Sequence, residues 1–195
     1  VFQWSYLLTS NNNSYNITPS CIGTYGNYVY ATFIYNFDVY VVDTGDPVAV
    51  LPGPPSGRYG VGLMRINTLD LTYNVYALAD AVTIINSAFT IIDGFLYLTV
   101  SFQDSDLTIY NFNDYTTGVG TVPLVNRISS TIIRYTQNDI VDAINGIYGT
   151  TSVSTGNERA IISNISVTKK AVEVDNGTGI VLGRKVYVCG SYRGG

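Results

Sequence analysis

The chain has 195 residues, of which 46% are hydrophobic and only 12% are charged, against roughly 25% charged residues in an average soluble domain. The net charge of −4 and the complete lack of histidine argue against a nucleic-acid-binding surface and against chemistry or metal binding that uses imidazole. We therefore expect one β-rich domain with a full core, and we expect no enzymatic activity, no cofactor and no metal site.

The first nine residues alternate in a way that predicts an extended strand with one apolar face, formed by Phe2, Trp4, Tyr6 and Leu8. Residues 10–20 are polar and turn-forming, so they predict a spacer rather than a tight hairpin. Such a strand either folds back as the first strand of its own domain or inserts into the sheet of a neighbouring copy. The second alternative makes residues 1–9 a donor strand, and it leaves residues 21–195 as the β body.

The two cysteines, Cys21 and Cys189, lie near opposite ends of the chain and belong to no C-x-x-C motif. A disulfide between them would close a loop of about 170 residues and would indicate an oxidising compartment. Two buried free thiols are the alternative. The sequence begins at Val1 without a basic leader, as an exported product does after processing, and no apolar run reaches the length of a membrane span.

Four N-x-S/T sequons predict surface glycosylation in an extracellular protein. Two lie in the polar spacer and one lies on an Asn-Gly turn, both of which are exposed types of segment. Their acceptor residues are Asn12, Asn16, Asn164 and Asn176.

The central part of the chain reads as consecutive strands. Residues 27–42 are rich in β-branched and aromatic side chains, which predicts one long strand or two strands joined by a bulge near Asn36. The next segment contains Pro47, Pro52, Pro54 and Pro55, so it predicts a turn-rich loop or a sheet edge rather than a central strand. Further strands are expected at 69–78 and 81–92.

Asp93-Gly94 is the strongest hairpin signal in the chain, because this dipeptide accepts the positive φ angles of a type I′ turn and has strand-like residues on both sides. After it we expect strands at 95–100 and 107–112, a turn at Gly118-Val119-Gly120, and a strand at 128–135.

One short helix is predicted after Asn138-Asp139, where Ile140, Val141, Ala143, Ile144 and Ile147 have helical spacing and Gly149 follows as a stop signal. Strands are expected again at 160–174, 180–182 and 186–189. About ten strands with no βαβ rhythm indicate an all-β fold, an antiparallel β-sandwich of the Ig-like or jelly-roll kind with one short helix.

Few residues suggest chemistry. Asp43, Asp46, Asp104 and Asp106 lie in turn-like contexts without the spacing of a calcium loop, so we expect them to cap turns. Lys169 shares strand parity with Glu173, and a buried lysine beside a carboxylate can form an isopeptide bond with an Asn or Asp side chain. The alternative for Lys169 is a side chain that reaches back to solvent.

The aromatic first strand, the Asn/Ser/Thr spacer, the sequons and the Tyr-rich, weakly charged body together resemble the subunit of archaeal thread filaments, and archaeal bundling pili come second. The resemblance implies a structural subunit of a cell-surface filament that serves adhesion or biofilm formation and joins identical subunits head to tail by donor-strand complementation. It also implies N-linked glycans and covalent links between subunits. It gives Phe2, Trp4, Tyr6 and Leu8 the donor role. A different class of function, a monomeric secreted β-sandwich that binds carbohydrate through surface tyrosines, stays open.

Overall fold

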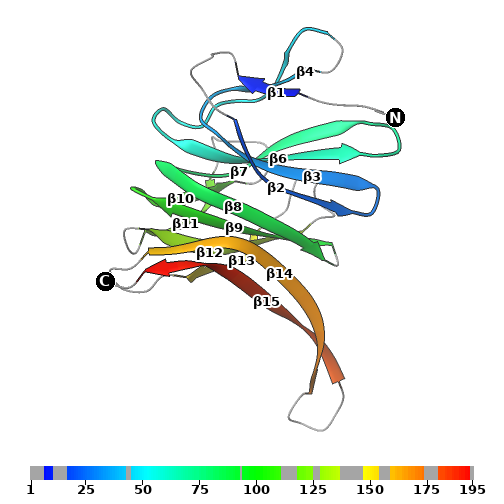
Figure 1. Ribbon diagram of the computed structural model, residues 1–195, viewed down its shortest axis with the longest axis vertical. Helices are drawn as coiled ribbons and strands as arrows, with labels where there is room; N and C mark the ends of the chain where they lie inside the picture. Colours follow the sequence, from blue (N-terminus) through cyan, green and yellow to red (C-terminus); the bar gives the residue numbers. More distant parts are fainter. Residues whose placement is uncertain are drawn as a thin grey trace.

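The computed structural model describes residues 7–10, 17–42, 45–92, 94–110, 118–124, 128–136, 147–153, 159–173 and 180–193. All regular structure in these residues is β-strand, and every strand pairing is antiparallel (Figure 1). The strands are β1 (Leu7–Ser10), β2 (Thr18–Tyr25), β3 (Tyr28–Tyr35), β4 (Val39–Val42), β5 (Val48–Leu51), β6 (Tyr59–Asn67), β7 (Tyr73–Ala81), β8 (Thr83–Ile92), β9 (Phe95–Gln103), β10 (Leu107–Tyr110), β11 (Gly118–Val122), β12 (Ser129–Thr136), β13 (Ile147–Val153), β14 (Arg159–Glu173) and β15 (Ile180–Arg193).

The main core lies between two sheets, so the predicted antiparallel sandwich is confirmed at this level. A six-stranded sheet in the order β11-β10-β7-β6-β3-β2 faces a four-stranded sheet in the order β13-β12-β9-β8. Tyr30 and Leu63 from the first sheet pack in one cluster with Leu98 and Phe102 from the second, and all four are fully buried. Burial of large apolar side chains at this interface contributes roughly 1.5–3 kcal/mol each.

The opposite face of the six-stranded sheet is also covered, by a small sheet in the order β1-β4-β5. Its core contains Phe33 and Met64 of the larger sheet and Val39 and Val41 of β4. Successive residues of a strand point to opposite faces, so β3 and β6 contribute to both cores and need apolar residues at nearly every position. Gly62 is required where the two layers meet, because a Cβ there would lie 2.4 Å from the Phe33 ring.

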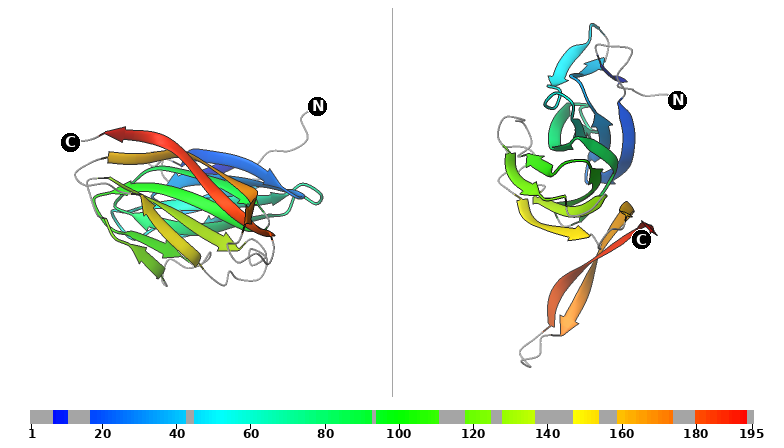
Figure 2. Two further views of the ribbon diagram at one scale, coloured as in Figure 1. Left: turned by 90° about the horizontal axis from the view of Figure 1, so that it is seen from below. Right: turned by 90° about the vertical axis from the view of Figure 1, so that its left-hand side faces the viewer.

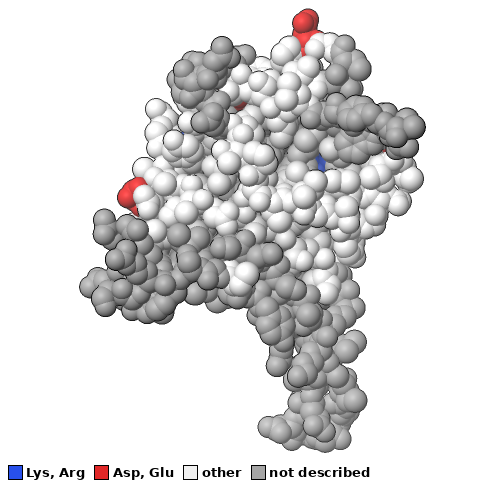
Figure 3. Space-filling view, in the orientation of Figure 1, with Lys and Arg blue, Asp and Glu red and all other residues white. Residues whose placement is uncertain are grey.

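The last two strands, β14 and β15, form a long hairpin of their own. One part of β14 packs against β8 and β9, and the hairpin then extends away from the body, as Figure 1 and the right-hand view of Figure 2 show. Over the face shown in Figure 3, the described surface carries few charged residues, in agreement with the composition. The described residues contain no helix with the length and hydropathy needed to cross a membrane.

Several local predictions are confirmed. The predicted hairpin is formed by β8 and β9, with Ile92 paired to Phe95 and with Gly94 at φ 76°, while Asp93 lies outside the described residues. The run at 27–42 forms two strands, β3 and β4, with residues 36–38 between them. The four prolines of the loop all lie outside strands, and β5 lies at a sheet edge.

The start of one predicted strand and one predicted turn are wrong because side-chain hydrogen bonds and tertiary pairing outweigh local pattern. The strand expected at 69–78 begins only at Tyr73, since the side chains of Asn67 and Asp70 accept bonds from the backbone N–H groups of Leu69 and Thr72 and close a turn. Leu69 is 74% exposed in that turn. The Gly118-Val119-Gly120 turn is in fact part of β11, where Gly118 pairs with Tyr110 and approaches Thr108 closely.

The helix predicted after Asn138-Asp139 is also not found. Ile147, its last apolar position, and Gly149, its stop signal, lie in β13 and pair with Tyr135 and Arg134 of β12. The remaining positions, 138–145, lie outside the described residues. The strands expected at 180–182 and 186–189 form one strand, β15.

Candidate functional site: the N-terminal strand and a neighbouring cleft

Strand β1 lies at the edge of the small sheet and pairs with β4 of the same chain. The register joins Leu7 to Val42, Leu8 to Val41, Thr9 to Tyr40 and Ser10 to Val39. Leu8 is half-buried against the second core, whereas Leu7 on the other face is 61% exposed. The side chain of Leu8 and the pairing of four residues with β4 help to hold this strand in place.

Of the predicted donor residues, only Leu8 lies in the described part of the chain, and residues 7–10 there fold back onto their own domain. Phe2, Trp4 and Tyr6 lie outside it. The spacer expected at residues 10–20 is shorter in the structure. Ser10 belongs to β1, and β2 (Thr18–Tyr25) begins before the expected end of the spacer. Asn12 and Asn16 lie outside the described residues.

Both cysteines are free in the structure, so the predicted disulfide is not formed there. Cys21 is half-buried on β2, and its Sγ lies 3.8 Å from the backbone oxygen of Phe89 on β8. Cys189 is exposed on β15. The two thiols belong to different sheets, the six-stranded sheet and the C-terminal hairpin.

The remaining predicted site residues belong to the C-terminal hairpin. Asn164 pairs with Cys189 at a shift in register, Lys169 pairs with Arg184, and Glu173 pairs with Ile180 at the far end of the described hairpin. Asn176 lies outside the described residues.

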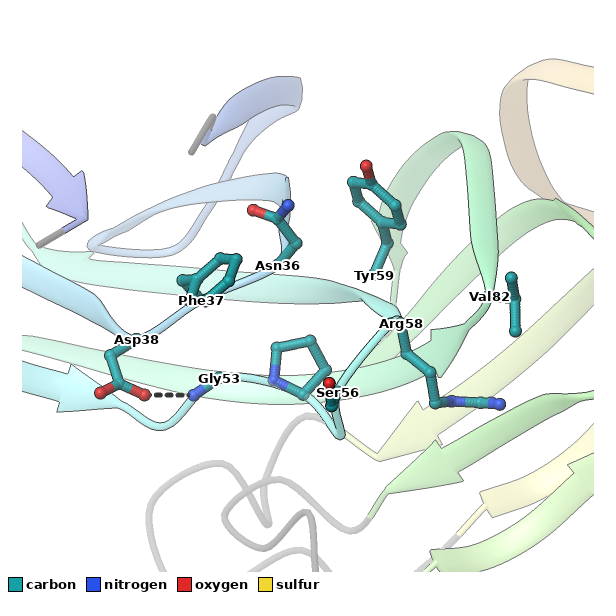
Figure 4. A pocket seen from close by; sticks show the side chains of 10 residues that line it. Asn36, Phe37, Asp38, Gly53, Ser56, Arg58, Tyr59 and Val82 are labelled. Carbon is teal, nitrogen blue, oxygen red and sulfur yellow. Dashed lines mark hydrogen bonds between the residues drawn. The ribbon is translucent and has the colours of Figure 1, made fainter. Parts of the chain in front are cut away.

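A cleft of 670 Å³ opens where the corner between β3 and β4 meets the proline-rich loop. Phe37 and Tyr59, which are 42% and 40% exposed, line this cleft, and Figure 4 shows their rings on either side of Asn36. The lining residues come from three places in the sequence, namely 36–38, 53–59 and Val82.

The cleft is held open by bonds between its own walls. Oδ1 of Asp38 accepts a hydrogen bond of 2.7 Å from the backbone N–H of Gly53 (Figure 4). A Cβ at Gly53 would lie 3.1 Å from backbone atoms of Phe37 and Asp38, so this close approach favours glycine. The backbone N–H of Arg58 donates to the Pro55 oxygen at 3.0 Å, and Gly57 between them has a φ of 79°.

Arg58 in the cleft wall forms an ion pair with Asp80, which lies behind the lining. Asp80 is fully buried and also accepts a hydrogen bond from the hydroxyl of Tyr110. The Arg58 guanidinium donates further bonds to the backbone oxygens of Asp80 and Asp106, at 3.1 and 3.2 Å. Arg58 therefore ties the loop to β7 and β10, and its charge is already neutralised.

Sequence reasoning singled out neither the cleft nor this ion pair. A signal was present, because Arg58 and Arg65 are the only basic residues before Arg127. Two aspartates that were expected to cap turns make other bonds: Asp104 accepts from the side chains of Thr83 and Gln103, and Asp106 accepts from the backbone N–H of Leu124, 18 residues further along the chain.

No protein-family model, no curated protein and no solved structure matches the chain. A functional proposal therefore depends on the geometry described above.

Proposed function

We propose that the protein is a structural subunit of an extracellular filament, in which the N-terminal strand of one copy replaces β1 of the next. The observation that supports this proposal is the place of β1, a short edge strand that is paired with β4 alone and is separated from it in sequence by β2 and β3. Exchange of such a strand between identical chains preserves its register and its contacts, so it leaves the rest of the fold unchanged.

The intramolecular pairing of β1 is weak enough to be exchanged. Full burial of a leucine contributes roughly 1.5–3 kcal/mol, and Leu8 is only half-buried. The alternation over residues 1–9 places Phe2, Trp4 and Tyr6 on the same face of an extended strand as Leu8. A longer strand in a neighbouring copy would bury these aromatic side chains as well, and this gain favours polymerisation.

The acceptor in this proposal is the edge of β4 together with the second core. Departure of β1 uncovers the backbone groups of Val39–Val42 that face away from β5, together with the apolar side chains that Leu8 covers in the second core. An uncovered apolar edge attracts another strand. The same attraction makes a subunit without a strand beside β4 prone to aggregation, and it makes the contact between two subunits long-lived once a neighbour's strand is in place.

Deletion of residues 1–9 is the direct test. We expect the truncated protein to form no filaments in electron microscopy and to aggregate, and we expect a synthetic Val1–Thr9 peptide to restore a compact monomer. The matched control peptide has serine at Phe2, Trp4, Tyr6 and Leu8, and it should not rescue. Normal filaments from the truncated protein, or a stable monomer that ignores the peptide, would show that the strand belongs to its own domain.

An extracellular location also predicts glycans at Asn12, Asn16, Asn164 and Asn176. Intact mass of the native protein should exceed the 21.2 kDa polypeptide by glycan increments. A peptide map with all four asparagines unmodified would contradict this part of the proposal.

A further inference from the structure

Beyond filament formation, we infer that the cleft between the β3–β4 corner and the proline-rich loop binds a neutral saccharide. The cleft has a volume of 670 Å³, within the roughly 300–1,000 Å³ of small-molecule sites. Its lining combines exposed aromatic rings with a carboxylate, Asp38, that has one oxygen left to accept hydrogen bonds, and each of these features restricts the ligand.

The aromatic rings favour a ligand with an apolar face. Phe37 and Tyr59 are 42% and 40% exposed, and both line the cleft. One face of a pyranose ring presents C–H groups, whose slight positive charge is attracted to the electron-rich face of an aromatic ring. Tyr59 combines such a face with a hydroxyl that can bond to the edge of the same sugar.

The polar groups favour a ligand that donates several hydrogen bonds. The Oδ1 atom of Asn36 is buried without a hydrogen-bond partner, which costs roughly 1–3 kcal/mol, but the atom is closed to solvent and offers no acceptor to a ligand in this conformation. Asp38 uses one carboxylate oxygen for Gly53 and leaves the other as an acceptor. Sugar hydroxyl groups are donors that can bond to this second Asp38 oxygen.

The charge of the cleft excludes anionic ligands. The guanidinium of Arg58 is engaged by Asp80, and its side chain extends away from the two aromatic rings (Figure 4). Asp38 is the other charged residue of the lining. Phosphates, nucleotides and uronic acids would therefore meet a carboxylate without a free cation, whereas a neutral sugar meets acceptors for its hydroxyl groups.

A peptide strand fits these walls less well than a sugar. Residues 36–38 and 53–58 lie outside strands, so they offer no regular row of backbone donors and acceptors to which a strand could add. The walls are also fixed in advance by the Asp38–Gly53 hydrogen bond and by the Arg58–Asp80 pair. Because little has to be ordered on binding, a small ligand loses less free energy there.

The test is a titration of the full chain with neutral trisaccharides of mannose, glucose and N-acetylglucosamine, followed by NMR, with trigalacturonate as the anionic comparison. We expect saturable binding of at least one neutral trisaccharide and none of trigalacturonate. Phe37→Ala and Tyr59→Ala should each weaken binding at least tenfold, and Asp38→Asn about threefold. Leu69→Ala removes an equally accessible apolar side chain on the β6–β7 turn, and it should leave binding unchanged.

Thermal unfolding of each variant shows whether the variants remain folded, and Tyr59→Phe tests the hydroxyl with the ring kept in place. The saccharide can come from free polysaccharide or from a glycan on a neighbouring copy. If the protein binds the added trisaccharide equally before and after its own glycans are removed enzymatically, the ligand is free polysaccharide. If it binds the trisaccharide only after deglycosylation, a glycan of a neighbouring copy had occupied the cleft. Absence of binding by every neutral trisaccharide, or affinity that neither aromatic substitution changes, would overturn the inference.

Discussion

Two strand pairings in this protein, β8 with β9 and β1 with β4, differ in how the chain connects them. The strands β8 and β9 adjoin in sequence, pair from Thr83–Gln103 to Ile92–Phe95, and place Phe89 and Leu98 in the main core. The strands β1 and β4 pair over four residues and are separated in sequence by all of β2 and β3.

The difference shows which pairing can be exchanged between molecules. A strand held by a tight turn cannot leave its partner unless the core it lines is taken apart. Strand β1 has no such turn to β4 and contributes only the edge of a small core. The body of the sandwich and its N-terminal edge should therefore respond to different perturbations.

The largest expected effect is complete loss of filaments when β1 is locked to its own β4. Thr9 and Tyr40 are register partners, and cysteines at facing positions of an antiparallel pair lie within disulfide distance. We expect the Thr9→Cys, Tyr40→Cys protein, with Cys21 and Cys189 replaced by serine, to form filaments when reduced and none when oxidised. The single-cysteine variants are the controls. Filaments from the oxidised protein, with an intramolecular bridge verified by mass, would rule out exchange of β1.

In the body, loss of the buried ion pair should have the largest effect on stability. Asp80→Asn leaves Arg58 without its carboxylate partner, and removal of one member of a buried pair costs about 3–5 kcal/mol. Denaturant unfolding should show this loss, while Asp46→Asn at an exposed position should change stability by less than about 0.5 kcal/mol. Equal stability of the two variants would mean that the Arg58–Asp80 pair does not hold the loop.

The turn that joins β8 to β9 should be the next most sensitive position. Gly94 has a φ of 76°, where a residue with a Cβ is strained by about 1–3 kcal/mol. Gly94→Val should lower the unfolding temperature by several degrees in calorimetry. Gly45→Val is the matched control, because a Cβ at Gly45 meets open space and no positive φ occurs there. Filament assembly of both variants should be normal below the unfolding temperature.

The core also predicts a loss of stability in alkali. Burial raises the pKa of Tyr135 above its usual value of 10.0, and its hydroxyl donates to the Leu78 oxygen at 3.1 Å. A raised folded-state pKa means that the unfolded state releases its proton first, so stability is full below pH 10 and falls above it. The loss for one such group is about 1.4 kcal/mol per pH unit. From pH 9 to pH 11, denaturant unfolding should show a loss of stability that Tyr135→Phe reduces by about 1.4 kcal/mol in total, because the full slope is reached only above pH 10.

The sequence could predict those parts of the fold that depend on neighbouring residues, and it could not predict pairings between distant segments. The β8–β9 hairpin was predictable because turn chemistry and alternation are both local, within residues 88–100. The β6–β7 turn was missed because Leu69 looks like a strand residue, and the side-chain bonds of Asn67 and Asp70 determine its exposure. The strand β13 was missed because its pairing with β12 is not encoded in its own spacing.

The candidate site was predictable only in part for the same reason. The alternation at residues 1–9 indicated a strand, but its partner β4 follows from the fold. The cleft joins Phe37, Tyr59 and Val82 from separate segments, and no motif in the sequence links them. The low charge of the chain was visible at once, whereas the burial of Asp80 against Arg58 was not.

The smallest expected effect separates opening of β1 from unfolding of the body. Leu8→Ala removes a half-buried side chain from the second core, at a cost of about 1 kcal/mol. Because β1 is an edge strand, this cost should appear as local opening, with faster hydrogen exchange in the β1 amides that pair with β4 and unchanged exchange in β8 and β9. Leu7→Ala, at a position 61% exposed, should leave hydrogen exchange unchanged both in β1 and in β8 and β9. If Leu8→Ala instead accelerates exchange equally in β1 and β9, the edge strand opens only with the whole domain, and exchange between subunits requires unfolding.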